Sequence, residues 1–553
     1  MSRGKFHQRD WLSALVLVAA AVVFLTQCRA IGHAEIDDAF FTFSYSRNLA
    51  LGHGPVYSHG VRVEGYSTFL WMALMALGLL VNHGTALVTT ARIVGAPFVV
   101  LLGWATWRLA RACGAGRLVA SLCVLLLSFN TDLAVAYLTG METLAHVALL
   151  TTGFAALAAT WPGAPDSTAA GWRRAVPWIA LAVGLNRIDG FVGFGFLLGS
   201  TWLGDLLARR PRPLRLAFLT CGPPVLVYLI WFFWRWHYYG LPLPSTYYAK
   251  ALIPKLLPGR GWDYVTTELL DGWLWCGLAG LAWLGGRRRV IALVPGAFVL
   301  IHLGYVVKVG GDWMPFGRFV LPVVPLLLVL FATAADDLIG VAARWPGPVR
   351  ALIPAGLVVW AAMVAARMDH RFFNNDHERA QLADVAVQRS NVESYLQVAE
   401  FLRQIVPPGG HLVTDYGGVF SCYTDGALIE MWGLANATIA VRGDASGINP
   451  IYGKTCPACY PELQPEYFHV LHPMLRPLAA FTSSDQVIDN VWQTDTIGRY
   501  IDFRAEFIAG RVLRPGTDQA LYFLQKRVPG VKLAPHPTAD GFLVEYPFED
   551  RDP

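Results

Sequence analysis

Long apolar runs separated by short charged loops fill the first two thirds of this chain. A straight helix needs about 20 apolar residues to cross the hydrocarbon core of a bilayer. Several runs reach that length, and the shorter ones either re-enter the membrane or continue into helices with polar ends. The pattern predicts a mainly α-helical, polytopic membrane bundle with about 11 to 13 spanning helices. The runs fall near residues 11–30, 68–82, 92–110, 117–129, 142–160, 176–188, 190–207, 216–235, 270–285, 290–308, 319–338 and 350–367.

Composition divides the chain into two parts. Charged residues make up 15% of the 553 residues, whereas soluble domains carry roughly a quarter. The deficit lies before about residue 367, which predicts a membrane module over 1–367 and a soluble domain over 368–553. In the second part, a helical stripe at 391–405 is followed by short β-like runs, which predicts a small α/β domain. These runs lie at 411–413, 427–429, 438–441 and 467–471.

Basic residues set the expected orientation in the membrane. Arginines cluster in short loops at 209–215 and 287–289, and such loops stay on the cytoplasmic side. Counting crossings from them predicts a multi-pass protein of the cell membrane, with a cytoplasmic N-terminus and an extracytoplasmic C-terminal domain. The arginines at 108–117 conflict with this count unless one neighbouring run does not cross. The first run, 11–30, is longer than a signal-peptide core, so we interpret it as a retained helix.

Two adjacent carboxylates, Asp37 and Asp38, lie in the loop expected first outside the membrane, at residues 31–66. One Asp is explained as the N-cap of the helical stretch that follows. Two carboxylates side by side near a bilayer are costly, which favours a role for one of them as general base toward an acceptor hydroxyl. Because Asp38 leads directly into the stretch at 40–51, we expect it to be the cap and Asp37 to be the base.

The stretch at 40–51 is amphipathic and is expected to lie along the membrane surface. Its Arg47 is available to a phosphate, or it extends toward lipid headgroups. In the soluble domain, the turns at 414–418 and 430–436 are expected to shape the face that meets the membrane module.

Three cysteines of the soluble domain suggest a disulfide if that domain faces an oxidising compartment. Cys456 and Cys459 have the spacing of a redox motif. Because no thioredoxin-like strand and helix frame them, we expect a structural disulfide instead, with Cys422 as an alternative partner.

Six short motifs stand in one order along the chain. They are Asp37-Asp38-Ala39, Glu64-Gly65-Tyr66, Gly140-Met141-Glu142-Thr143, Arg187-Ile188-Asp189-Gly190, Tyr238-Tyr239-Gly240 with residues 242–250, and Gly310-Gly311-Asp312-Trp313-Met314 with Arg318. Each motif is weak alone, but the ordered set resembles the GT-C superfamily of integral membrane glycosyltransferases over most of the chain. It is similar in particular to the terminal arabinofuranosyltransferases that build mycobacterial cell-wall arabinan, and to their bacterial relatives.

The resemblance implies a sugar donor carried on polyprenyl phosphate and an acceptor glycan or glycolipid of the cell envelope. It also implies a catalytic carboxylate in the first external loop, which is Asp37 or Asp38 here. Candidates for binding the donor phosphate are Arg187, Lys250, Arg318 and Arg47. Candidates for binding the substrates are Glu64, Tyr66, Glu142, Asp189, Tyr247 and Asp312. A mutual ion pair is the alternative for Arg187 and Asp189, and an anchor at the membrane surface is the alternative for Lys250.

Other classes of function are less well supported by the sequence. The chain has no P-loop, zinc-protease motif or dinucleotide fingerprint, and no basic face typical of nucleic-acid binding. We predict no metal site, because two adjacent Asp residues make a poor cation cage, and dependence on a divalent cation stays open. A flippase or transporter of lipid-linked sugars would show inverted repeats, which we do not find. A cell-envelope scaffold would leave the membrane motifs unexplained.

Overall fold

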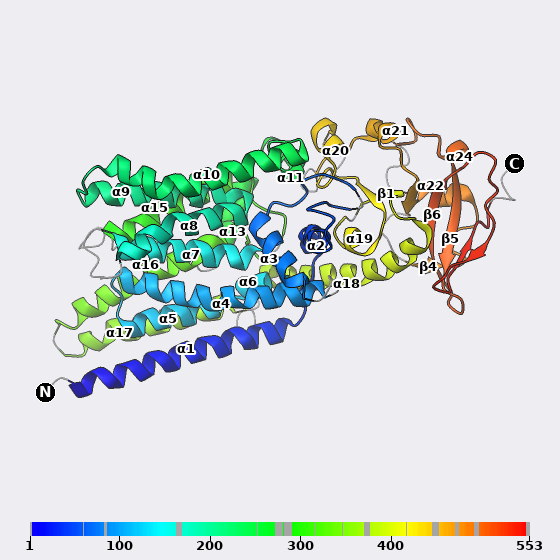
Figure 1. Cartoon of the computed structure of the whole chain (residues 1–553). Helices are drawn as coiled ribbons and strands as arrows, with labels where there is room; N and C mark the ends of the chain where they lie inside the picture. The colour runs from blue at the N-terminus through cyan, green and yellow to red at the C-terminus, as the bar shows by residue number, and fades with distance from the viewer. Residues whose placement is uncertain are drawn as a thin grey trace.

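The computed structural model describes residues 3–58, 60–81, 86–161, 169–250, 253–270, 280, 290–314, 316–345, 347–369, 376–415, 417–444, 453–469, 475–491 and 497–548. A bundle of long helices forms one end of the molecule and a mixed α/β domain forms the other (Figure 1). The two chain termini lie at opposite ends (Figure 1). The predicted fold class, a membrane helix bundle with a C-terminal α/β domain, is confirmed.

Eight helices among the described residues are long and apolar enough to cross a membrane. The number is nine if the pair α5 (Arg117–Ser128) and α6 (Thr131–Leu138), bent by 61°, forms one broken span. Both numbers are below the about 11 to 13 spans that the apolar runs predict. The eight are α1 (Arg3–Ile31), α4 (Leu87–Ala112), α7 (Thr143–Thr160), η1 (Ile188–Gly190) with α9 (Phe191–Leu207), α10 (Pro213–Tyr239), α15 (Val290–Val309), η2 (Leu321–Val323) with α16 (Val324–Ala342), and α17 (Val349–Met368).

The shorter apolar runs explain the difference in the number of spans. The run at 68–82 forms α3 (Phe69–Leu79), whose 11 residues are too few for a straight span. The helix over 117–129 ends before Asn130, whose side chain accepts the N–H of Leu133 and so starts α6 in a new direction. The run at 270–285 lies mostly outside the described residues.

Helix α7 lies at the centre of the bundle, because its small residues allow close packing on every side. Its sequence is rich in Ala, Thr and Gly, and nearly all of its side chains are buried. It packs against α4 on one side and α8 (Ala169–Asn186) on the other. Helices α1, α10 and α17 lie on the outside and present large apolar side chains outward, as expected of helices that face lipid.

The α/β domain contains a mixed sheet in the order β2-β1-β3-β6-β5-β8-β7, with β4 also paired to β6. The first three strands in this order are parallel, and the remaining pairs are antiparallel. Helix α18 (Asp376–Ile405) connects the bundle to the sheet (Figure 1). The strands are β1 (His411–Thr414), β2 (Ala427–Glu430), β3 (Tyr467–His469), β4 (Arg476–Pro477), β5 (Phe507–Leu513), β6 (Gln519–Lys526), β7 (His536–Pro537) and β8 (Leu543–Glu545).

One expected strand of the α/β domain is wrong, and the expected disulfide is present. The run at 438–441 is not a strand but part of α20 (Ala437–Arg442), because the Asn436 side chain accepts the N–H of Ile439 and caps a helix there. Cys456 and Cys459 form the expected disulfide, and the alternative partner Cys422 is not part of it. The other short helices of this domain are α19 (Gly418–Tyr423), η3 (Pro457–Cys459), α21 (Tyr460–Leu463), α22 (Ser484–Asp489) and α24 (Phe503–Glu506).

Helix α2 (Asp37–Ala50) lies between the bundle and the α/β domain (Figure 1). Most of its residues are buried, and its expected place along the membrane surface stays a prediction. Helix α3 covers one side of α2, and α19 of the α/β domain covers another. The element that carries the two adjacent carboxylates is therefore the contact between the two parts of the chain.

Candidate functional site

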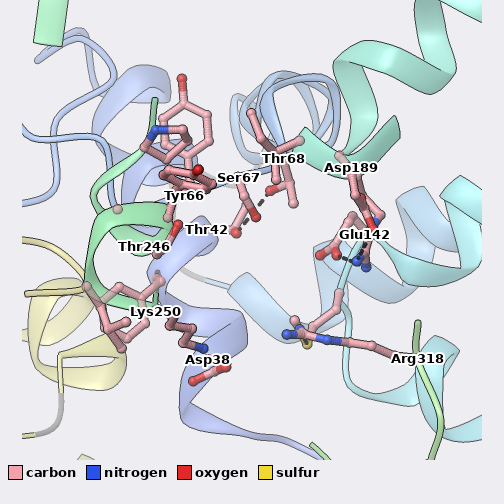
Figure 2. Close-up of a pocket in the computed structure, with 18 of the residues that line it drawn as sticks. Asp38, Thr42, Tyr66, Ser67, Thr68, Glu142, Asp189, Thr246, Lys250 and Arg318 are labelled. Carbon is pink, nitrogen blue, oxygen red and sulfur yellow. Dashed lines mark hydrogen bonds and ion pairs between the residues drawn. The ribbon is translucent and has the colours of Figure 1, made fainter. Parts of the chain in front are cut away.

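The end of the bundle that faces the α/β domain contains a cavity of about 210 Å³. Its walls come from α2, residues 65–68, the start of α7, the junction of α8 and α9, and α11 (Ser245–Lys250) (Figure 2). Of the residues predicted from the sequence, eight line it: Asp38, Tyr66, Glu142, Arg187, Asp189, Tyr247, Lys250 and Arg318. The other four, Asp37, Arg47, Glu64 and Asp312, are not among the lining residues.

Asp37 and Asp38 begin α2 but have different partners. The N-cap residue of α2 is Ile36, so the expectation that Asp38 caps this helix is wrong. The Asp37 carboxylate accepts the backbone N–H groups of Gly418 (3.1 Å) and Val419 (2.8 Å) at the start of α19. Asp38 lines the cavity instead. One carboxylate of the pair therefore binds the α/β domain, and the other is available to a substrate.

The Asp38 carboxylate lies close to two basic side chains of the cavity. Lys250, in the last turn of α11, points toward Asp38 (Figure 2). Burial raises the pKa of Asp38, and the charges of Lys250 and Arg318 oppose that rise. Burial lowers the pKa of Lys250, which the charge of Asp38 opposes. A carboxylate with a raised pKa is a stronger base than a solvated one, which suits removal of a hydroxyl proton.

Arg187 is held by two carboxylates in the wall opposite Lys250. Its Nη1 lies 2.9 Å from the Glu142 carboxylate, and its Nε and Nη2 lie 2.8 Å and 3.0 Å from the two oxygens of Asp189. All three residues are buried. The structure therefore contains the mutual ion pair that the sequence left as an alternative, with Glu142 as a third member.

Arg318 keeps part of its guanidinium free for a ligand. Its Nε and Nη2 donate to the Asp312 carboxylate, with Nη2 at 3.2 Å. The remaining nitrogen, Nη1, contacts only the sulfur of Met141, at 4.0 Å, among the described residues. Asp312 lies outside the cavity lining, so it orients Arg318 from behind.

Behind the cavity wall, Glu64 forms a buried ion pair with Arg235 of α10. Arg235 did not stand out among the motifs, although a detectable signal existed. It is one charge in the apolar and aromatic run 224–236, and a lone charge in a membrane helix commonly has a function. Glu64 is therefore placed to support the wall of the cavity rather than to contact a substrate in it.

The α/β domain contributes one wall residue, Leu434. Its position depends on Glu430 at the end of β2, whose carboxylate accepts the backbone N–H groups of Trp432 (2.9 Å) and Ala435 (3.0 Å). A Cβ on Gly65 would lie 2.8 Å from the Cβ of Ala435, so the two walls meet closely at this glycine. The prediction that residues 430–436 form a turn facing the membrane module is confirmed here.

Curated relatives of the chain share one activity. No protein-family model matches it. The terminal β-(1→2)-arabinofuranosyltransferase of Corynebacterium glutamicum is 26% identical over 385 residues, which are 59% of this chain and 52% of that protein. The protein of the same name from Mycobacterium tuberculosis is 27% identical over 334 residues, which are 53% and 51%. The chain spans about half the length of the curated relatives it matches.

Solved structures share the architecture over nearly the whole chain. ArnT from Cupriavidus metallidurans in the apo state aligns over 94% of this chain and 98% of its own, with a TM-score of 0.54 and 13% identity. The oligosaccharyltransferase AglB from Archaeoglobus fulgidus, in complex with an inhibitory peptide and a dolichol-phosphate, aligns over 95% and 75%, with a TM-score of 0.51 and 11% identity. The chain has the GT-C fold. The predicted resemblance to this superfamily and to the terminal arabinofuranosyltransferases is thereby confirmed.

Arg47, which was predicted to bind the donor phosphate, has no place in the cavity. Arg47 lies in the last turn of α2, away from the lining residues. Within the described ranges, no group of three or more His, Cys, Asp or Glu side chains is placed to hold a metal ion. The charged groups that the cavity offers to a ligand are therefore Asp38, Lys250 and the free edge of Arg318.

Proposed function

We propose that this protein is a membrane glycosyltransferase that moves a sugar from a polyprenyl-phosphate donor to a glycan or glycolipid acceptor of the cell envelope. One observation carries the proposal: a half-buried carboxylate, Asp38, faces Lys250 and Arg318 in a cavity where the bundle meets the α/β domain. A base and a site for an anionic leaving group are the two parts that such a transfer needs.

Lys250 and Arg318 are the proposed binding groups for the donor phosphate. Lys250 makes no direct ion pair with the residues that the structure describes, and Nη1 of Arg318 has only a sulfur contact. Both cations therefore have hydrogen-bond donors to give to a phosphate, whereas the guanidinium of Arg187 is already bound by two carboxylates. The solved structure of ArnT with undecaprenyl phosphate, which aligns at a TM-score of 0.51, supports a lipid phosphate as ligand of this fold.

Asp38 is the proposed general base. It takes the proton of the acceptor hydroxyl while the hydroxyl oxygen forms a bond to the anomeric carbon of the sugar. The bond between that carbon and the phosphate oxygen breaks, and polyprenyl phosphate leaves with the electron pair. Attack from the side opposite the phosphate inverts the anomeric configuration. Lys250 and Arg318 stabilise the negative charge that develops on the leaving phosphate.

The proposed sugar is arabinofuranose, and the proposed site of reaction is the outer face of the cell membrane. The sugar follows from the curated relatives, both of which are terminal arabinofuranosyltransferases. The outer face is supported by the arginine cluster at 209–215, between the end of α9 and the start of α10, which favours the cytoplasm at the end of the bundle away from the α/β domain. The α/β domain and the cavity are then extracytoplasmic.

The proposal is tested with the full chain purified into lipid nanodiscs. The assay follows radiolabelled polyprenyl-phosphate arabinofuranose, an arabinan oligosaccharide as acceptor, and the released polyprenyl phosphate. We expect transfer by the native protein, at least a 100-fold loss in Asp38→Asn, and unchanged transfer in Glu462→Gln, which alters an exposed carboxylate. Full transfer by Asp38→Asn would overturn the role of Asp38.

The same preparation separates the transferase from the alternative flippase. A flippase moves the labelled lipid between leaflets in proteoliposomes without releasing polyprenyl phosphate, so movement without release would overturn the transferase proposal. Parallel reactions with EDTA and with added Mg²⁺ measure whether a divalent cation is required.

A further inference from the structure

Arg235 is a fully buried charge in the outermost helix of the bundle. Helix α10 faces outward along most of its length, and the neighbouring Trp234 and Trp236 are 39% and 42% exposed. Arg235 between them is 0% exposed. Burying an arginine at a membrane boundary is costly unless it is paired, so a feature of the fold must require it.

The guanidinium group of Arg235 donates two hydrogen bonds to separate partners. Nη1 donates to the carboxylate of Glu64, and Nη2 donates to the backbone carbonyl of Pro242. The guanidinium also lies over the rings of Trp231 and Phe232, at 5.5 Å and 5.1 Å from their centroids. A planar fork can make both hydrogen bonds at once, which a lysine ammonium does less well.

These contacts attach α11 to the cavity wall at two points. The carbonyl of Pro242 is held by Arg235, and the N–H of Ser245 donates to the carbonyl of Glu64 at 2.9 Å. Helix α11 begins at Ser245 and carries Lys250, the proposed phosphate ligand, at its end. The two partners of one ion pair therefore fix the start of the helix that positions Lys250.

The same ion pair supports the adjoining part of the cavity wall. Residues 65–68, which follow Glu64 directly, line the cavity. A buried tyrosine fixes this segment from behind: the hydroxyl of Tyr45 donates to the carbonyl of Val63 at 2.6 Å and accepts the N–H of Gly65 at 2.7 Å. The ion pair thus contacts both helix α11 and the segment that leads into residues 65–68.

We propose that Arg235 and Glu64 are a positioning pair that sets the separation of Lys250 and residues 65–68 for binding of the donor phosphate. The inference rests on the proposed function, because it assumes that Lys250 binds this phosphate. The pair touches no substrate. Its loss is expected to weaken donor binding more than it slows the chemical step.

The test compares Glu64→Gln, Arg235→Lys, Arg235→Met and the double variant Glu64→Gln with Arg235→Met. We expect Glu64→Gln and Arg235→Met each to raise the KM for the donor by about tenfold or more, with kcat changed by less than about threefold. Arg235→Lys is expected to recover part of the loss, because it keeps the charge. The double variant is expected to be less impaired than the product of the two single effects, because neither partner is left as an unpaired buried charge.

A matched control is available at the far end of the bundle. Arg173 and Asp205 form another buried pair, at 2.5 Å, between the start of α8 and the end of α9. Arg173→Met removes the buried arginine of this pair, while Asp205 keeps a contact with Arg210 at 3.5 Å. We expect the KM of this variant for the donor to stay native in the protein that folds. An equal rise in KM for Arg173→Met would overturn the inference, because the effect would then be general destabilisation.

Direct binding of undecaprenyl phosphate gives a readout that does not need turnover. The native protein is expected to bind this probe more tightly than Glu64→Gln, by about the ratio of their KM values. If Arg235→Met does not fold, the inference is tested with Glu64→Gln alone. Native binding of the probe and a native KM for the donor in Glu64→Gln would overturn the inference. Native protein that binds the probe but transfers no sugar would instead contradict the proposed function and leave the positioning role standing.

Discussion

The carboxylate of Asp37 accepts the backbone N–H of Val419 at 2.8 Å, although 382 positions separate the two residues in the chain. The N–H of Gly418 adds a second bond at 3.1 Å. The first turn of α2 therefore holds the start of α19, and the next residue in the same turn is Asp38. One helical turn therefore has two roles: Asp37 attaches the α/β domain, and Asp38 places the proposed base in the cavity.

Asp37→Asn is expected to weaken the attachment of the α/β domain. The asparagine oxygen accepts one of the two N–H groups, and its own amide group opposes the other, so about 1–3 kcal/mol of stability is lost. Thermal unfolding of the purified protein checks this, and Asp37→Asn should retain more transferase activity than Asp38→Asn. The opposite order of activities would contradict the separate roles of these two residues.

Gly418→Ala is expected to separate α19 from α2. A Cβ at Gly418 would lie 2.0 Å from the backbone oxygen of Asp37, a distance that neither segment can accept without moving. The melting temperature and the activity should both fall. Gly195→Ala is the control, because its Cβ meets nothing within 4 Å and alanine favours a helix; a fall in both variants would argue against a specific contact.

Lys250→Gln is expected to raise the KM for the donor about 10- to 100-fold, the range for loss of a hydrogen bond to a charged group. Stability should change little, because Lys250 has no direct ion pair among the described residues that its loss would leave unsatisfied. Inhibition by added polyprenyl phosphate should weaken in parallel. An unchanged KM would remove Lys250 from the phosphate site.

Arg187→Gln is expected to act through folding. It leaves the carboxylates of Glu142 and Asp189 buried without their cation, at a cost of about 3–5 kcal/mol. The yield of folded protein and its melting temperature measure this loss. Arg442→Gln, which removes an exposed ion pair with Glu462, should change stability by less than about 1 kcal/mol. A stable Arg187→Gln with a raised donor KM would restore the phosphate-binding role predicted from the sequence.

The stability of the folded protein is expected to decrease as pH rises from about 4 to about 7. Burial raises the pKa of Asp37 and of Glu430 to about 7 each. In this window the unfolded chain releases these protons and the folded chain retains them, so the folded state is favoured at the acidic side and loses that advantage as pH passes the folded pKa.

Melting temperatures at several pH values between 5 and 8 check this dependence. The change with pH should be smaller in Glu430→Gln and native in Glu462→Gln, whose carboxylate is exposed. A melting temperature that rises steadily from pH 5 to 7 would contradict the buried protonated carboxyl groups.

The membrane bundle was predictable because apolar length is a local property of the sequence. The burial of α2 was not predictable for a non-local reason: α19 and α3 pack against it, and α19 begins at residue 418. The periodicity of the sequence around α2 could not predict that these two helices would bury it. The run at 438–441 contains three residues that favour strands, yet the side chain of Asn436 caps a helix there.

The candidate site was predictable as a set of residues but not as a set of contacts. Motif order brought together Asp38, Lys250 and Arg318, which line one cavity. It could not assign Asp37 to the α/β domain, because adjacent residues of a helix point in directions about 100° apart and the domain's position was unknown. Arg235 was missed because its partner Glu64 lies 171 positions earlier.

The position of Leu434 in the sequence determines when the cavity wall is completed during synthesis of the chain. This wall residue lies beyond the last described spanning helix, which ends at Met368. Because chains emerge and fold from the N-terminus onward, all the helices in the described part of the bundle are made before Leu434 exists. The cavity is thus completed last, so a chain whose synthesis stops after Met368 lacks a finished wall and also the contact that holds Asp37.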